Sequence, residues 1–180
     1  LSKGFLDGTL APEDLALEDA DDTDLDATWL VGHRAVGLDV GLGAPGVEAT
    51  HCVTLDDGTV LVADAIVLAT GARARRLPAH LGGELAGVHV LRTLDDALAL
   101  RAELVPGSRL VLVGAGFVGA EIASTAHKLG VAVSLVEAST TPLAGPLGEE
   151  IGAAVAGLHT AHGVPLYCGV PVAGLTGTTQ

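Results

Sequence analysis

Three glycines with a fixed spacing give the most direct link between this sequence and a chemical task. The pattern G-x-G-x-x-G follows the apolar run at residues 109–113 and precedes a helical pattern that starts at Phe117. In such a turn the first glycine permits the tight bend, the second lets the backbone approach a pyrophosphate, and the third lets the helix pack closely on the strand. The start of the helix adds free N–H groups and the positive end of its dipole. We therefore expect a dinucleotide to be held by Gly114, Gly116, Phe117, Val118 and Gly119.

An acidic residue lies where such a site needs one. The next expected strand, residues 131–136, is followed directly by Glu137. A carboxylate there can accept hydrogen bonds from the adenosine ribose hydroxyls and would repel the additional 2′-phosphate of NADPH. The order of strand, turn, helix, strand and acid predicts a site for NADH. The alternative is a Rossmann-like unit that has lost its ligand.

The second half of the chain alternates between strand and helix patterns, which predicts a parallel, right-handed α/β sheet. Thr93 is the expected N-cap of a helix that runs to about Leu104, with Asp96 completing a variant of the capping box. Glycine or proline marks the ends of the first two helices. The expected strands are 88–90, 109–113, 131–136 and one that begins at 164, and the expected helices are 93–104, 117–129 and 149–160.

The first half reads as mostly β structure. Asp57 and Gly58 lie in a turn between two alternating apolar runs, 51–55 and 59–62, which is a strong signal for a hairpin. The continuous apolar run at 65–69 is typical of a strand buried on both faces. Further expected elements are strands at 28–31 and 34–40, a loop at 41–46 and a short helix near 12–17.

Composition narrows the classes of partner. The net charge is −13, with 9 Lys and Arg against 22 Asp and Glu. An acidic surface argues against nucleic acid and anionic membranes as partners, and no apolar run is long enough to span a bilayer. Cys52 and Cys168 are too far apart in sequence to indicate a metal or redox pair, so we expect no metal site and a reducing, cytoplasmic location.

Three further segments carry a resemblance to a known family. They are residues 1–6 (LSKGFL), 66–73 (IVLATGAR) and 90–97 (VLRTLDDA). Together with the glycine pattern they resemble the FAD-dependent pyridine nucleotide oxidoreductase superfamily, in particular its bacterial NADH-dependent ferredoxin and rubredoxin reductases. The resemblance implies two cofactors, FAD and NAD, and a ferredoxin or rubredoxin-like electron acceptor.

The resemblance also implies a domain organisation. Residues 1–83 correspond to part of a discontinuous FAD-binding domain, and 84–180 to an NAD-binding domain of Rossmann type with three-layer ββα character, incomplete at its C-terminus. The overall fold class is therefore α/β. The family's own FAD-binding glycine pattern is expected to precede Leu1, so we interpret the chain as an internal fragment.

Individual residues acquire roles from the same resemblance. Lys3 corresponds to a residue against the flavin ring, and Glu121 to one that faces the flavin from the NAD domain. We expect Lys3 and Glu121 to form an ion pair, in which Lys3 is buried and the two-domain fold brings it to Glu121. The alternatives are a solvated Lys3 and a helix-dipole role for Glu121. The implied FAD contacts are the backbone of Ala35, the motif Ala69, Thr70 and Gly71, and Arg92. The alternative is sheet packing for Ala35, strand termination for Thr70, and a solvated surface side chain for Arg92.

Two other functions stay open at this point. One is an NADH oxidase or CoA-disulfide-type reductase, and the other is a redox-sensing NAD-binding module like apoptosis-inducing factor. The family often has an arginine near residues 143–146, and this chain has none. An additional basic contact to NAD is therefore not expected.

Overall fold

The computed structural model describes residues 1–15, 27–41 and 50–178 of the chain. These residues fall into two compact units. The larger unit consists of Leu1–Leu17 and Arg73–Gln180, and the smaller of Glu18–Ala72. Each unit is described by itself below.

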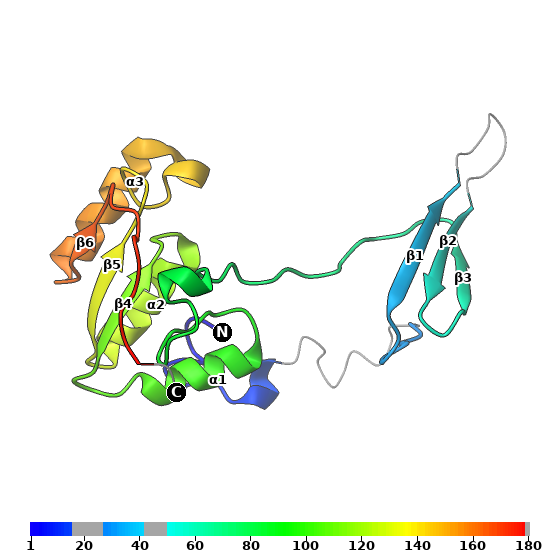
Figure 1. The fold of residues 1–180 in the computed structure, drawn as a ribbon, viewed down its shortest axis with the longest axis horizontal. Helices are drawn as coiled ribbons and strands as arrows, with labels where there is room; N and C mark the ends of the chain where they lie inside the picture. Colours follow the sequence, from blue (N-terminus) through cyan, green and yellow to red (C-terminus); the bar gives the residue numbers. More distant parts are fainter. Residues whose placement is uncertain (16–26, 42–49, 179–180) are drawn as a thin grey trace. The chain divides into compact units, whose positions relative to one another are not determined.

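The larger unit is built on a parallel sheet of three strands. Strands β4 (Arg109–Val113), β5 (Ala132–Val136) and β6 (Leu166–Tyr167) lie in the order β4-β5-β6. Helix α2 (Phe117–Lys128) connects the first two strands, and helix α3 (Ala144–Ala161) connects the last two (Figure 1). The predicted α/β fold and its Rossmann-like βαβ unit are confirmed. The described residues of this unit contain one sheet, so the second β layer of the expected ββα arrangement is not among them.

Helix α1 (Leu94–Glu103) begins at the predicted capping box. The hydroxyl of Thr93 accepts a hydrogen bond from the backbone N–H of Asp96, and the Asp96 carboxylate accepts one from the N–H of Thr93. This second bond is the main reason that the pKa of Asp96 lies below its usual value. Two otherwise unpaired N–H groups at the start of the helix are thereby satisfied.

Helix α3 begins earlier than predicted and contains a kink. Gly148 has φ +81°, so the helix from Glu149 onward, which the sequence predicted, is preceded by a separate turn that starts at Ala144. Leu143 before it adopts φ +56°, a left-handed conformation that is unusual for a residue with a branched side chain. The chain therefore makes a sharp bend shortly after the end of β5.

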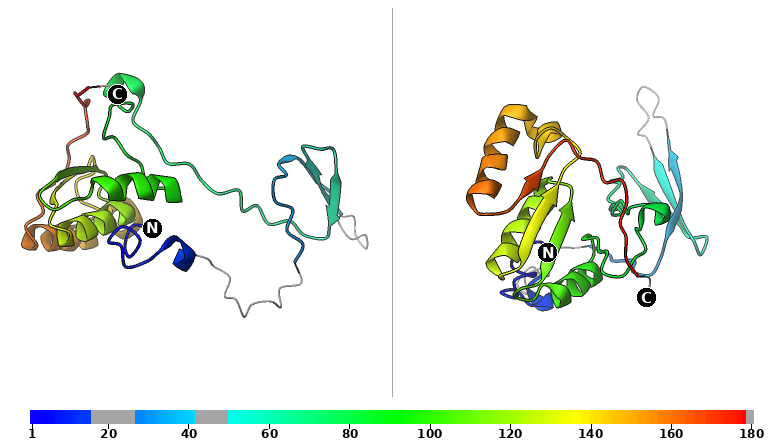
Figure 2. Two further views of the ribbon diagram at one scale, coloured as in Figure 1. Left: turned by 90° about the horizontal axis from the view of Figure 1, so that it is seen from below. Right: turned by 60° about the vertical axis from the view of Figure 1, so that its left-hand side comes forward.

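The first residues of the chain pack into the core of the larger unit. Phe5 and Leu6 are each 1% exposed and join apolar side chains of α1, α2 and β5. Arg101 of α1 places its guanidinium 5.5 Å from the centre of the Phe5 ring and donates a hydrogen bond to the Phe5 carbonyl. Both views in Figure 2 show this segment beside α1 and α2. This N-terminal segment belongs to the same compact unit as the glycine turn. The predicted boundary at residue 83 divides the chain by cofactor instead, and it stays a prediction.

The smaller unit is an antiparallel sheet of three strands, β1 (Ala35–Val40), β2 (His51–Leu55) and β3 (Val60–Ala63), in that order. It confirms the strand predicted at 34–40 and the predicted hairpin. Gly58 in the turn has φ +87°, a conformation that favours glycine. Most of the loop predicted at 41–46 lies outside the described residues.

Three predicted strands were wrong. Residues 28–31, 65–69 and 88–90 have no strand partner among the described residues. Val31 and Val67 are 86% and 87% exposed. An apolar run forms a strand only where a neighbouring strand accepts its backbone hydrogen bonds, and periodicity does not report on that neighbour.

Short 3-10 helices complete the described structure. One, η1 (Pro12–Leu15), lies where a helix was predicted, and the other, η2 (Ala79–Leu81), was not predicted. In the part of the chain that the structure describes, no helix is both long and apolar enough to cross a bilayer.

Candidate functional site

The glycine turn joins the end of β4 to the start of α2. Gly114 has φ +102°, so the bend depends on glycine. A Cβ atom on Gly119 would clash with the carbonyl oxygen of Gly114, which explains why the third position lacks a side chain. A Cβ on Gly116 would meet no atom of the chain within 4 Å. The second glycine therefore leaves space open beside the turn, as a bound pyrophosphate requires.

The N-terminus of α2 has the features of an anion site. Gly116 is its N-cap, and no side chain caps the helix. The first N–H groups of an α-helix have no partner within the helix, and the helix dipole is positive at this end. Phe117 and Val118 in the first turn are 55% and 49% exposed. The start of the helix is thus accessible to a phosphate group.

Glu137, which directly follows β5, binds the backbone of the glycine turn. Its Oε2 accepts a hydrogen bond of 2.7 Å from the N–H of Ala115, and its Oε1 accepts one of 2.8 Å from the N–H of Ser139. Partial burial alone would raise the pKa of Glu137, but the hydrogen bonds from Ser139 and Ala115 outweigh it and leave the pKa below its usual value. The residue is a carboxylate at neutral pH, next to the fingerprint as predicted. Its contact with a ribose stays a prediction.

Lys3 and Glu121 form the predicted ion pair. The distance from Lys3 Nζ to Glu121 Oε1 is 3.1 Å. In this structure the side chain of Lys3 is 73% exposed. Both residues belong to the larger compact unit. The burial of Lys3 against the flavin and its assignment to the FAD-binding domain stay predictions.

Two hydroxyl groups that the sequence did not single out complete this cluster. Ser2 Oγ donates a hydrogen bond to Oε2 of Glu121, and Thr125 Oγ1 donates one of 2.9 Å to the carbonyl of Ser2. Both were missed because serine next to a lysine, and threonine within a helix, carry no recognisable signal of their own. The spacing of Glu121 and Thr125, four residues apart on a helix, was the available clue.

The other predicted FAD contacts lie in less regular structure. Ala35 opens β1 and pairs with Leu55. Ala69, Thr70 and Gly71 are exposed in a stretch without helix or strand, and Gly71 has φ +74°. These four residues belong to the smaller unit. Arg92 belongs to the larger one, where its backbone N–H donates to Asp96 beside the start of α1. Their roles toward FAD stay predictions.

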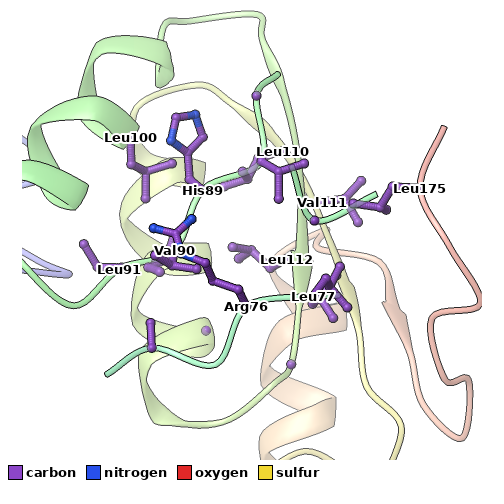
Figure 3. Close-up of a pocket in the computed structure, with 18 of the residues that line it drawn as sticks. Arg76, Leu77, His89, Val90, Leu91, Leu100, Leu110, Val111, Leu112 and Leu175 are labelled. Atoms are coloured by element: carbon purple, nitrogen blue, oxygen red, sulfur yellow. The ribbon is translucent and has the colours of Figure 1, made fainter. Parts of the chain in front are cut away.

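An apolar cavity of about 760 Å³ lies beside β4, and the sequence did not predict it. Leu110 and Leu112 of β4 and Leu100 of α1 contribute to its wall, as Figure 3 shows. Gly114, Val118 and Gly119 also line it, so it reaches the glycine turn. The cavity could not be seen in the sequence because its walls come from segments far apart along the chain.

Polar groups in the hairpin have a structural role. Asp56 accepts a hydrogen bond from the N–H of Arg34, and Asp57 accepts one from the N–H of Thr59 and lies 3.3 Å from His33. The imidazole of His33 and the carboxylates of Asp56 and Asp57 lie close together, but all three residues are exposed. Both carboxylates already accept hydrogen bonds from backbone N–H groups. We assign no metal to them.

The two thiols belong to different compact units. Cys52 is on β2 in the smaller unit, Cys168 follows β6 in the larger one, and both are free. Burial, together with the nearby negative charge of Glu137, raises the pKa of Cys168. That thiol is therefore protonated at neutral pH, which makes it a poor nucleophile.

A parallel sheet with a glycine turn, an uncapped helix start and an ionised glutamate on the adjacent strand defines a dinucleotide-binding protein of Rossmann type. The chain belongs to the pyridine nucleotide-disulphide oxidoreductase family, whose model matches residues 1–180.

Two similar proteins are ferredoxin reductases of dioxygenase systems. The chain is 40% identical over 178 residues to the ferredoxin reductase component of chlorobenzene dioxygenase from Cupriavidus sp. (strain PS12), covering 98% of this chain and 41% of that protein. It is 38% identical over 180 residues to the ferredoxin–NAD(+) reductase subunit of the benzene 1,2-dioxygenase system from Pseudomonas putida, covering 100% and 42%. The chain thus spans about two-fifths of the length of these relatives.

Solved structures agree with this assignment. The reductase in a covalent putidaredoxin reductase–putidaredoxin complex superposes with a TM-score of 0.72 at 32% identity, over 99% of this chain and 42% of the other. A ferredoxin reductase from Rhodopseudomonas palustris gives a TM-score of 0.76 at 29% identity, over 98% and 42%. Both similarities extend over nearly the whole chain.

Proposed function

We propose that this chain is part of an FAD-dependent oxidoreductase that passes electrons from NADH, through FAD, to a small iron–sulfur protein. The observation that carries the proposal is the ionised Glu137 bound to the glycine turn, in a chain similar over nearly its whole length to ferredoxin reductases. The cytoplasm is the location that fits the free cysteines.

The NADH end of the reaction is assigned to the larger unit. The backbone of Gly114 to Gly119 would cradle the pyrophosphate, with Phe117 and Val118 at the exposed helix start. Glu137 would bind the adenosine ribose. Its negative charge would disfavour the 2′-phosphate of NADPH, which supports NADH as the coenzyme.

The FAD end is assigned to the residues that the resemblance to the family implies. Ala35, Ala69, Thr70, Gly71 and Arg92 would hold FAD. When bound, FAD supplies the chemistry that accepts a hydride and releases electrons one at a time. This assignment keeps residues 1–83 as part of the FAD-binding domain and 84–180 as the NAD-binding domain.

Lys3 and Glu121 would act beside the flavin ring. The Lys3 ammonium group would provide positive charge next to the flavin and so stabilise its reduced form. Glu121 would hold that charge in place through the 3.1 Å ion pair. In the complete protein the flavin and its domain would cover Lys3, and a paired lysine is the form that tolerates such desolvation.

The proposal is tested by comparing electron acceptors. The complete flavoprotein is supplied with NADH and with a ferredoxin, a rubredoxin, oxygen or a disulfide in parallel steady-state assays. We expect kcat/KM for the ferredoxin or rubredoxin to exceed those for oxygen and disulfides by at least about a hundredfold, a difference of roughly 2.7 kcal/mol in transition-state free energy. Faster turnover with oxygen or a disulfide would instead indicate an NADH oxidase or disulfide reductase.

A further inference from the structure

The carboxylate of Glu121 is shared between two neighbours in the N-terminal segment. Lys3 Nζ lies 3.1 Å from one oxygen, and Ser2 Oγ donates a hydrogen bond to the other. Each oxygen therefore has its own partner, and the carboxylate cannot rotate without losing one of them. This arrangement restricts the orientation of the carboxylate plane.

Thr125 of α2 binds the main chain of the N-terminal segment at Ser2. It lies one turn after Glu121 on the same face of α2, is 5% exposed, and donates a 2.9 Å hydrogen bond to the carbonyl of Ser2. A buried hydroxyl that lost this acceptor would keep an unsatisfied donor, which is costly. Thr125 thus ties the main chain of Ser2 to the helix that carries Glu121.

The segment is also anchored on the other side of Lys3. Phe5 and Leu6 are buried in the core, and Arg101 donates to the carbonyl of Phe5. The backbone of Lys3 is therefore held between two attachment points. Its side chain is 73% exposed and is held by the ion pair with Glu121.

We infer that Ser2 and Thr125 are positioning residues that align the Lys3–Glu121 pair, an inference that rests on the proposed function and deepens it. Exposed ion pairs between long side chains are weak because each partner samples many rotamers. The hydrogen bond from the Ser2 hydroxyl restricts the Glu121 carboxylate. The hydrogen bond from Thr125 holds the main chain from which the Ser2 side chain extends. Lys3 then meets an acceptor that is already oriented.

The electrostatics of Glu121 agree with this geometry. Its pKa is lowered first by the hydrogen bond from Ser2 and second by the one from Lys3. Losing the Ser2 hydroxyl should therefore move the pKa of Glu121 upward, toward its usual value.

Four variants separate positioning from general structure. Ser2→Ala and Thr125→Val each delete one hydroxyl, and the valine keeps the shape of threonine. Thr125→Ser restores the hydroxyl and serves as the rescue. Ser124→Ala removes an exposed hydroxyl from the same helix and is the matched control.

The first measurement follows the Glu121 carboxyl carbon by NMR titration of the full chain, with no flavin involved. We expect the pKa of Glu121 to rise in Ser2→Ala and in Thr125→Val, and to stay unchanged in Thr125→Ser and Ser124→Ala. An unchanged pKa in Ser2→Ala, or equal behaviour of the serine and valine variants at position 125, would overturn the inference.

The second measurement is the rate and pH profile of flavin reduction by NADH in the complete flavoprotein. Ser2→Ala and Thr125→Val should slow reduction by roughly fivefold, the effect of one lost hydrogen bond, and should displace the pH profile in step with the Glu121 pKa. Wild-type rates and profiles in both variants would overturn the role. If the wild-type protein showed no flavin reduction, the proposed function would fail, while the titration would still report on Ser2 and Thr125.

Discussion

Glu137 at the end of β5 accepts a 2.7 Å hydrogen bond from the backbone N–H of Ala115 in the turn after β4. The carboxylate that would select the coenzyme is thus fastened to the loop that would bind its phosphates. A second bond, from the N–H of Ser139, fixes the other oxygen. We therefore expect the charge at this position to affect both coenzyme choice and the stability of the turn.

Coenzyme preference should change when that charge is reversed. We expect Glu137→Gln combined with Ser139→Arg to shift the ratio of kcat/KM for NADPH over NADH by at least about tenfold toward NADPH, because repulsion of the 2′-phosphate is replaced by attraction. Steady-state kinetics of the complete flavoprotein with both coenzymes measure the ratio. Equal use of NADH and NADPH by the unaltered protein would contradict the role of Glu137.

The second and third glycines of the pattern should respond differently to replacement by alanine. Gly119→Ala should destabilise the protein by about 1–3 kcal/mol, because its Cβ would clash with the Gly114 carbonyl oxygen. Gly116→Ala should leave the melting temperature almost unchanged, since its Cβ enters open space, but should weaken NADH binding. Thermal unfolding and NADH titration of both variants provide the comparison. Matching losses of stability in the two would refute the distinction.

Stability should depend on the protonation of Glu137 at acid pH. Its pKa in the folded state lies below the ordinary value of 4.5, so its stabilising contribution is present above that value and is lost as the pH falls through the folded-state pKa. Urea unfolding of wild type and Glu137→Gln across this range should show the free-energy difference between them shrinking as the pH falls. A difference that stayed constant with pH would rule out this linkage.

The N-terminal segment should contribute to the core of the larger unit. Phe5→Ala should lower the free energy of unfolding by about 3–5 kcal/mol, because a fully buried aromatic ring leaves a cavity. Leu10→Ala, at a site that is 40% exposed, is the control and should cost much less. Chemical denaturation measures both, and similar losses in the two variants would show that the segment is not part of the core.

The thiols should be dispensable. Exchanging Cys52 and Cys168 for serine should leave NADH oxidation with an artificial acceptor nearly unchanged, since the thiols are in different units and that of Cys168 has a raised pKa. A loss beyond about tenfold in a folded protein, or roughly 1.4 kcal/mol of transition-state stabilisation, would instead support a thiol mechanism.

The sequence by itself determined the features that depend on neighbouring residues. The glycine turn requires a positive φ at Gly114, the capping box joins Thr93 to Asp96, and the hairpin turns at Gly58. Each of these is built within a few residues, so composition and spacing are enough to predict it. The position of Glu137 follows too, because parallel adjacent strands place their carboxyl ends at one edge of the sheet.

Only the tertiary structure decided which distant residues meet. It placed Phe5 and Leu6 in the same core as the glycine turn, brought Ser2 to Glu121, and gave Thr125 its acceptor. Among the residues that the structure describes, it also gave the apolar run at 65–69 no strand partner. Local patterns indicate what a residue is able to bury or donate. Its partner comes from elsewhere in the chain, and tertiary packing and hydrogen bonding together select that partner.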